Sequence, residues 1–183
     1  TLFPYTTLFR SLPEGSSRTI ALEAGEIDFI IEVEAMDADR LKGNDDLTVI
    51  DYNATNLTWL MLNNETPGLD NQDVRHAINT AIDKESVVTV AYNGMATPAL
   101  SQMPMNFEGA TEENADTYDV EKAKEWLEKS GVDPASIKFS IICSDDTKKR
   151  AGEVIQANLK EIGINCEIES MDLATYLSAT AKD

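Results

Sequence analysis

The sequence is poor in the residues from which metal centres and disulfide scaffolds are built. Its 183 residues include one histidine and two cysteines, Cys143 and Cys166. Two cysteines so widely spaced are too few for a zinc site or a disulfide framework, although they could form one bridge or stay reduced. One histidine leaves no cluster of imidazole ligands. We therefore expect neither a metal nor any other cofactor.

Positive charge and long apolar runs are also scarce. The chain has 15 Lys and Arg residues against 33 Asp and Glu residues, which gives a formal net charge of −18 at pH 7. Such a charge repels phosphate backbones and argues against nucleic acid as a partner. No apolar run is long enough to predict a membrane-spanning segment. The hydrophobic content of 42% is nevertheless ordinary for a globular protein.

Apolar periodicity predicts helices that alternate with short strands. The clearest helix covers residues 71–83, "NQDVRHAINTAID", where apolar residues at helical spacing form a single stripe. Further helices are predicted over residues 16–28, 84–94, 119–131, 146–163 and 172–181. Strands are predicted over residues 29–33, 47–51, 57–64, 137–143 and 164–170. Strands and helices in alternation indicate an α/β fold with a parallel sheet.

The sequence contains no recognisable catalytic motif. A glycine-rich phosphate loop, a G-x-S-x-G elbow and an H-E-x-x-H pair are all missing. His76 lies on the flank of the helix over residues 71–83, beside the core position Ala77. It could act as a base or a ligand, but no Ser or Cys nucleophile has a second partner near it. We therefore interpret His76 as a partly exposed helix residue and expect no enzymatic activity.

One polar stretch has a position typical of binding sites. Asp145 and Asp146 follow the strand over residues 137–143 and begin a helix, and ligands of open α/β sheets lie beyond the carboxyl ends of strands. Ser144 and the first helical amides could hold an anionic or carbonyl group there. Equally, Ser144 or Asp145 could simply cap the helix. Trp59 is expected in the core, although its place near a strand end could also let it face a ligand.

Several segments together resemble a known family. Residues 60–104 resemble the signature region of the bacterial extracellular solute-binding proteins of family 5, which serve peptide and nickel ABC transporters. The matching positions are Asn63, Pro67, Leu69, Asp70, Val74, Arg75, Ala77, Ile78, Ala81, Ile82, Asp83, Gly94, Pro98 and Ala99. "SRTIALEAGEID" upstream and "DVEKAKEWLEKSG" and "EVIQANLKEIGINCEIESMDLATYL" downstream also resemble the family, in the same order. The resemblance runs from about Leu12 to the end.

The resemblance implies part of a two-lobe periplasmic-binding-protein fold of type II. Residues 12–52 would be the tail of the first lobe, and residues 53–183 a second lobe that is incomplete at its C-terminus. A mostly parallel or mixed sheet flanked by helices would form that second lobe. Such proteins capture oligopeptides or related solutes between their lobes and deliver them to ABC permease subunits. We therefore expect an extracytoplasmic monomer, in the periplasm or as a cell-surface lipoprotein, that meets the membrane only through an anchor outside this sequence.

The resemblance and the position beyond the strand end together give the candidate ligand-binding residues. These are Trp59, Asn63, Cys143, Ser144, Asp145 and Asp146. Dipeptide-binding members of the family place an Arg near residues 143–146, where this sequence reads Cys-Ser-Asp-Asp. This departure argues against a dipeptide and leaves longer peptides or another solute open. Nickel binding, and a signalling or chaperone-like peptide receptor of the same fold, stay open as alternatives.

Two further segments stand apart from this pattern. Residues 95–118 lack regular periodicity, and Met103, Pro104 and Phe107 suggest either a cleft-edge or permease-facing loop or a loop packed on its own apolar residues. Residues 1–11, "TLFPYTTLFRS", are similar to the translation of a common short-read sequencing adapter. We expect these eleven residues to be an artefact without a role in the fold, joined to a chain that starts inside a longer protein.

Overall fold

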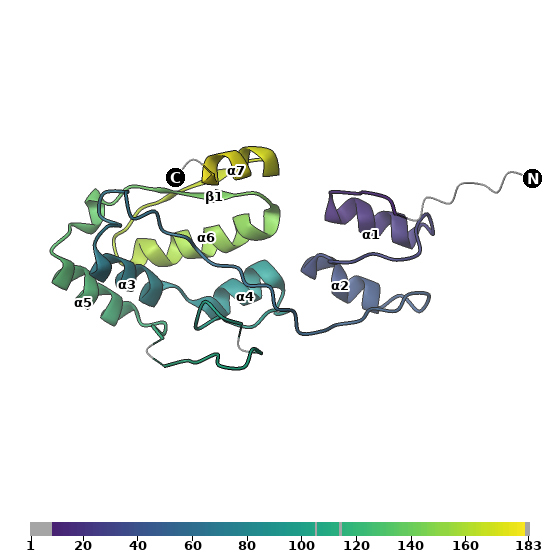
Figure 1. The fold of residues 1–183 in the computed structure, drawn as a ribbon, viewed down its shortest axis with the longest axis horizontal. Helices are drawn as coiled ribbons and strands as arrows, with labels where there is room; N and C mark the ends of the chain where they lie inside the picture. Colours follow the sequence, from purple (N-terminus) through teal and green to yellow (C-terminus); the bar gives the residue numbers. More distant parts are fainter. Residues whose placement is uncertain (1–8, 105, 114, 182–183) are drawn as a thin grey trace, which may run out of the picture. The chain divides into compact units, whose positions relative to one another are not determined.

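The computed structural model describes residues 9–104, 106–113 and 115–181, which divide into two compact units, Thr1–Tyr52 and Asn53–Asp183 (Figure 1). Most of the adapter-like segment lies outside the described residues. Of its last three residues, Phe9 is exposed and Arg10 pairs with Glu26 across 3.3 Å.

The described residues of the first unit form two helices, α1 (Gly15–Glu23) and α2 (Ala35–Lys42). Arg40 of α2 pairs with Glu23 of α1. The strand predicted over residues 29–33 is wrong, because Glu32 adopts a left-handed backbone with φ of 58° and bends the segment. The strand predicted over residues 47–51 is also not formed among the described residues.

The second unit has an α/β core. Its elements are α3 (Gln72–Ala81), α4 (Lys84–Tyr92), α5 (Val120–Ser130), the 3₁₀ turn η1 (Pro134–Ser136), β1 (Ser140–Cys143), α6 (Asp146–Glu161), β2 (Glu167–Ser170) and α7 (Leu173–Thr180). The two strands are parallel, with Ser140 opposite Glu167 and Cys143 opposite Ser170. Helix α6 packs on both strands, α3 packs on α5, and α4 packs on α6. The α/β class and the parallel pairing that the sequence predicts are confirmed.

Helix starts in this unit are fixed by local side chains. A side-chain oxygen at each N-cap accepts a hydrogen bond from a backbone N–H two or three residues further on. The five N-cap residues of α3 to α7 are Asn71, Asp83, Asp119, Asp145 and Asp172. Because each cap satisfies amides that the helix itself leaves unpaired, the predicted helices begin close to their predicted positions.

The core of the second unit centres on the apolar stripe of α3. Val74, Ala77, Ile78 and Ala81 are each at most 1% exposed. The rest of the buried cluster comes from α5, β1, α6 and the turns beside these elements and α3: Leu69, Ile82, Ala123, Leu127, Ile137, Ile141, Cys143, Leu159, Ile162, Ile164 and Cys166. Gly152 of α6 faces the sheet, where a Cβ at this position would be in ordinary van der Waals contact with the Cys143 Sγ, at 3.5 Å.

The segment predicted as a central strand over residues 57–64 is irregular in the structure. Leu60 and Leu62 pack against the core, whereas Trp59 and Met61 are 59% and 78% exposed. The prediction of a strand buried on both faces is therefore wrong for the described chain. A strand forms only where its backbone groups pair with a neighbour, and apolar pattern alone supplies no such partner.

Residues 95–118 contain no helix or strand in their described part, as expected. Asn106 Nδ2 donates to the Ala54 carbonyl at 3.4 Å. Near the other end of the segment, the Asp119 amide donates to the Thr80 carbonyl of α3 at 2.9 Å.

Two arginines of the family-like motifs have the same structural role. Arg75 donates to the carbonyls of Leu69 and Asp70 at 2.8 and 2.9 Å, which fixes the turn that precedes α3. Arg18 likewise donates to carbonyls that precede its own helix, those of Leu12 and Pro13, at 3.0 and 2.9 Å. Both guanidinium groups therefore hold backbone and are not free to receive a carboxylate on these donors.

Replacement of Arg75 is expected to destabilise the second unit. Arg75→Ala leaves two carbonyls without a charged donor, and we expect a loss of about 1–3 kcal/mol in the free energy of unfolding. Arg75→Lys should lose less, because one ammonium can still reach one carbonyl. Urea titrations followed by circular dichroism measure the difference, with Lys149→Ala on exposed α6 surface as the control, expected within about 0.5 kcal/mol. An Arg75→Ala chain as stable as the control would contradict this role.

Candidate functional site

The carboxyl end of β1 carries a small charged cluster. Asp145 accepts a hydrogen bond from the Lys148 amide at 2.8 Å and is therefore the N-cap of α6. The Lys148 Nζ lies 2.5 Å from the Asp145 Oδ2 and 2.9 Å from the Ser144 Oγ. Of the two capping residues that the sequence allowed, the structure selects Asp145.

Charge in this cluster is balanced internally. Burial raises the pKa of the Asp145 carboxyl, but hydrogen bonds from the Lys148 side chain and amide outweigh it and leave that pKa below its ordinary value. The same contact with Asp145 raises the pKa of Lys148. The Lys148 Nζ also lies 5.9 Å from the centre of the Tyr176 ring on α7. At the end of β1, the positive charge of Lys148 is therefore compensated by the carboxylate of Asp145.

The remaining candidate residues have different surroundings. Cys143 is 1% exposed, its Sγ lies 3.5 Å from the Lys148 carbonyl, and its own carbonyl accepts from the Met171 amide. Asp146 is exposed in the first turn of α6. Asn63 is exposed and accepts from the Glu65 amide at 2.8 Å. Trp59 is exposed rather than in the core. Residues 143–146 are brought together by β1 and α6, whereas Trp59 and Asn63 come from the irregular segment before α3.

Cys143 ends β1, whereas Cys166 lies just before the neighbouring strand β2, and the two are out of register. Cys143 pairs with Ser170, whereas Cys166 lies just before β2, four residues earlier along the same direction. At roughly 3.3 Å per residue this offset is about 13 Å, well beyond the separation of about 7 Å that a disulfide tolerates. Both cysteines are free and buried, and burial raises the pKa of both thiols.

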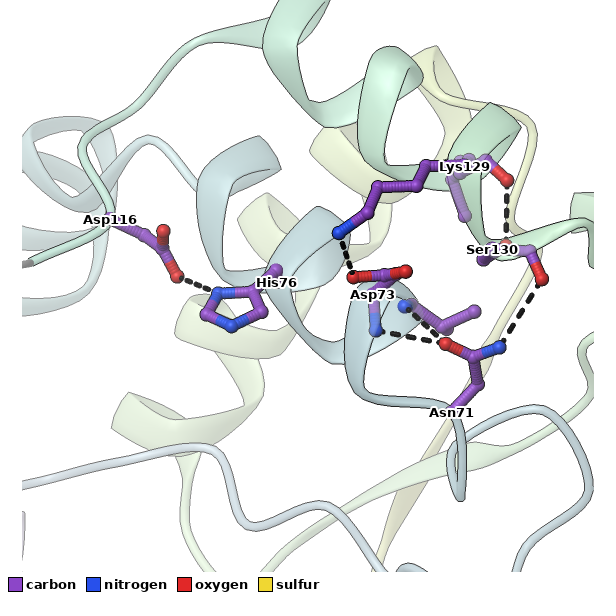
Figure 2. A network of polar contacts seen from close by, with 8 residues as sticks. Asn71, Asp73, His76, Asp116, Lys129 and Ser130 are labelled. Atoms are coloured by element: carbon purple, nitrogen blue, oxygen red, sulfur yellow. Dashed lines mark hydrogen bonds and ion pairs between the residues drawn. The ribbon is translucent and has the colours of Figure 1, made fainter.

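A second polar cluster joins α3, α5 and the 95–118 segment. The His76 Nδ1 lies 2.8 Å from the Asp116 Oδ2, and the imidazole stacks on the Trp126 ring with centroids 4.8 Å apart. The same Asp116 oxygen accepts from the Asn79 side chain at 3.2 Å. Figure 2 shows His76 directed from α3 toward Asp116. The sequence interpretation of His76 as a partly exposed helix residue is confirmed, since its side chain is 35% exposed.

Further contacts tie α3 to α5 beside this cluster. Lys129 of α5 reaches Asp73 of α3 at 2.9 Å (Figure 2). The Lys129 Nζ also lies 4.4 Å from the centre of the Trp126 ring. The Asn71 side chain donates to the Ser130 carbonyl at 3.3 Å. Sequence reasoning missed Asp116 as the partner of His76, because the two residues are 40 positions apart and no local motif joins them.

The charge on Lys84 is also affected by this part of the fold. Its Nζ donates to the Asp116 carbonyl at 3.4 Å. Burial lowers the pKa of Lys84, while the nearby Asp116 charge partly opposes that change. Asp116 is therefore the residue on which contacts from α3 and α4 converge.

Neither cluster is a metal centre by composition. Within the described part of the chain, no group of three or more His, Cys, Asp or Glu side chains is arranged to hold a metal ion. Among the same residues, the helices are each too short or too polar to cross a bilayer.

The fold matches that of one class of protein, the type II periplasmic binding proteins. Solved structures of that class match nearly the whole chain. The DppA periplasmic binding protein of an ABC transporter from Helicobacter pylori, in complex with the peptide STSA, matches 93% of the chain with a TM-score of 0.84 and 30% identity. The match covers 33% of that structure.

The chain belongs to the bacterial extracellular solute-binding proteins, family 5, whose model matches residues 6–183. It is 28% identical over 171 residues to heme-binding protein A of Haemophilus influenzae and 27% identical over 187 residues to the dipeptide-binding protein of Escherichia coli K12. These matches cover 90% and 97% of this chain but 31% and 34% of the relatives. The chain therefore spans about a third of the length of the relatives it matches.

Both thiols are expected to resist alkylation in the native chain. They are buried, and their raised pKa values keep them protonated near pH 8. Iodoacetamide should modify them slowly until guanidinium unfolds the chain, when both should react without added reductant. An exposed Ser178→Cys control should react at once. Mass spectrometry counts the labels, and two sites that stay blocked in denaturant until reduced would contradict the register of β1 and β2.

Loss of the α6 cap should weaken the second unit in a pH-dependent manner. We expect Asp145→Ala to lower the free energy of unfolding at pH 7 by about 1 kcal/mol, whereas Asp146→Ala removes only a first-turn charge and should cost less. Because the pKa of Asp145 is lowered by folding, its contribution is present above the ordinary aspartate range and is lost as the pH falls through the lowered value.

Urea titrations of both variants and the unmodified chain between pH 7 and pH 3 measure this difference. The stability gap between the unmodified chain and Asp145→Ala should close on acidification. A gap that widens at low pH, or an equal loss in Asp146→Ala, would count against Asp145 as the charged cap.

Proposed function

We propose that this chain is part of the solute-binding component of an ABC importer. The observation that carries the proposal is the structural match over 93% of the chain to a periplasmic binding protein with bound peptide. On this proposal, residues 12–52 belong to the tail of a first lobe and residues 53–183 to most of a second lobe. The solute lies in a cleft between lobes and favours their closed state, which docks on membrane permease subunits.

Oligopeptides are the solute class that we propose. The Escherichia coli relative is named for dipeptides, and the Helicobacter pylori protein holds the peptide STSA. The similar identity to a heme-binding protein means that overall likeness does not rank these solutes. The end of β1 adds a local argument: Lys148 is already paired with Asp145, so it offers no uncompensated charge to the carboxylate of a dipeptide. Peptides longer than dipeptides, or a related solute, fit this better.

Solute contacts are proposed for the residues around the end of β1 and for the segment before α3. Ser144 offers a half-buried hydroxyl, and the exposed Asp146 brings negative charge that suits a peptide amino group. Asp145 is already paired with Lys148, so we propose that it positions Ser144 and the start of α6 at the site. Trp59 and Asn63 supply an exposed indole and an exposed amide. Because Cys143 is buried, we propose that it supports the site by packing β1 against α6 rather than by side-chain contact. Backbone groups would meet an extended peptide in a strand-like mode.

The 95–118 segment is proposed as a cleft-edge or permease-facing element. Its Met95, Met103 and Phe107 side chains are 40%, 45% and 48% exposed, which is unusual for large apolar residues and leaves them free to contact a partner. We further propose that the complete protein acts outside the cytoplasm, as a monomer, and binds its solute without chemical change.

The chain alone is expected to bind peptide weakly or not at all, since it supplies one wall of the cleft. Isothermal titration calorimetry of the 183-residue chain with tri- to pentapeptides should show no saturable heat. The complete Escherichia coli dipeptide-binding protein with a dipeptide serves as the positive control. Micromolar or tighter binding by the chain would contradict the two-lobe proposal.

Experiments on the complete protein test whether it binds peptides without chemical change. Calorimetry with the same peptides should give saturable binding, and mass spectrometry should recover the bound peptide intact. Hydrolysed peptide would overturn the binding-only role, and the absence of peptide binding would overturn the proposed solute.

A further inference from the structure

The five arginines of the chain differ in what their guanidinium groups contact. Four of them pair with carboxylates or donate to backbone carbonyls: Arg10, Arg18, Arg40 and Arg75. Arg150 on α6 has neither kind of partner among the described residues. Its hydrogen bond there runs from Nη2 to the Thr147 Oγ1 at 3.0 Å, and its Nε is buried without an acceptor. The fold therefore leaves this one guanidinium without an anionic partner in the described chain.

We propose that Arg150 receives a carboxylate of the solute beside the end of β1. A guanidinium carries N–H donors in a planar fork that matches the two oxygens of a carboxylate. Arg150 is only half-buried, and the Thr147 hydroxyl occupies one of its donors. A carboxylate on the remaining donors compensates the charge and the unmet hydrogen bonds together. This inference rests on the proposed function and adds to it the solute group that the site recognises.

The helix directs the Arg150 guanidinium toward the proposed solute site. Side chains of an α-helix tilt toward its N-terminus, and residues three apart lie on one face. The bond to Thr147 therefore holds the guanidinium near the first turn of α6, which begins at Asp146. Ser144, already proposed as a solute contact, lies between β1 and this helix. Ligands of open α/β sheets bind beyond such strand ends.

The neighbouring cations on α6 are less suited to this role. Lys148 is already paired with Asp145. Lys149 is exposed, and an ion pair in full contact with water contributes little. The net charge of −18 repels anionic groups in general, so a carboxylate is attracted only where a cation lacks a partner. Arg150, half-buried and without a carboxylate of its own in the described chain, meets that condition.

A solute carboxylate can belong to the peptide C-terminus or to an acidic side chain, and calorimetry on the complete protein separates the two. One pair of probes is Ala-Ala-Ala and its C-terminal amide, and the other is the amides of Ala-Glu-Ala and Ala-Gln-Ala. In at least one pair, the peptide with the carboxylate should bind the unmodified protein about tenfold to a hundredfold more tightly. In Arg150→Gln that ratio should fall to about one, because glutamine keeps a donor but loses the charge.

Controls separate this role from folding and from the proposed function. Lys149→Gln removes the neighbouring exposed cation and should keep the ratio, and the peptides without a carboxylate should bind the unmodified protein and Arg150→Gln alike. The inference is overturned if Arg150→Gln keeps the ratio, or if neither pair shows a preference in the unmodified protein. Equal weakening of both members of a pair makes Arg150 a structural residue and also overturns it. If no peptide binds the unmodified protein, the proposed function fails, and this inference fails with it.

Discussion

The contact between α3 and α5 is the interaction on which the second unit depends. The buried stripe that includes Val74, Ala77 and Ile78 sets the rotation of α3 about its axis. That rotation fixes the directions in which the polar side chains beside the stripe point. Asp73 meets Lys129 and His76 meets Trp126, while Arg75 turns back to its own preceding loop. Apolar burial thus supplies the driving force, and the polar contacts follow from the orientation that it imposes.

Local signals in the sequence were sufficient for most helices. Caps and stripes lie within one or two turns of the residues they affect, so α3 to α7 could be predicted from them. Helix α2 was missed because its buried face consists mainly of Ala38 and Leu41, and Glu34 before it makes no side-chain cap. Three strands were predicted wrongly because pairing is not local: an apolar run indicates that a segment can be buried but not which backbone lies beside it.

The polar clusters of the second unit likewise divide into local contacts that the sequence could predict and non-local contacts that it could not. The N-cap at Asp145 could be foreseen as one of two alternatives, because a strand end followed by a helix start is a sequence feature. Its pairing with Lys148 lies within the same turn. The His76–Asp116 contact could not be foreseen, since the position of Asp116 depends on the path of a long segment without periodicity. Helix caps and apolar periodicity carry no information about the larger protein. The likeness to a two-lobe architecture came only from the family resemblance.

The out-of-register cysteines have a consequence for refolding. In the folded chain, parallel pairing of β1 and β2 keeps Cys143 and Cys166 apart, so oxidation by air cannot join them in an intramolecular disulfide. An unfolded chain lacks that separation, and a loop of this length closes readily. A bridge formed at that stage would lock the strands away from their native alignment. Reductant is therefore needed while the chain refolds from denaturant, and it becomes dispensable once the strands have paired.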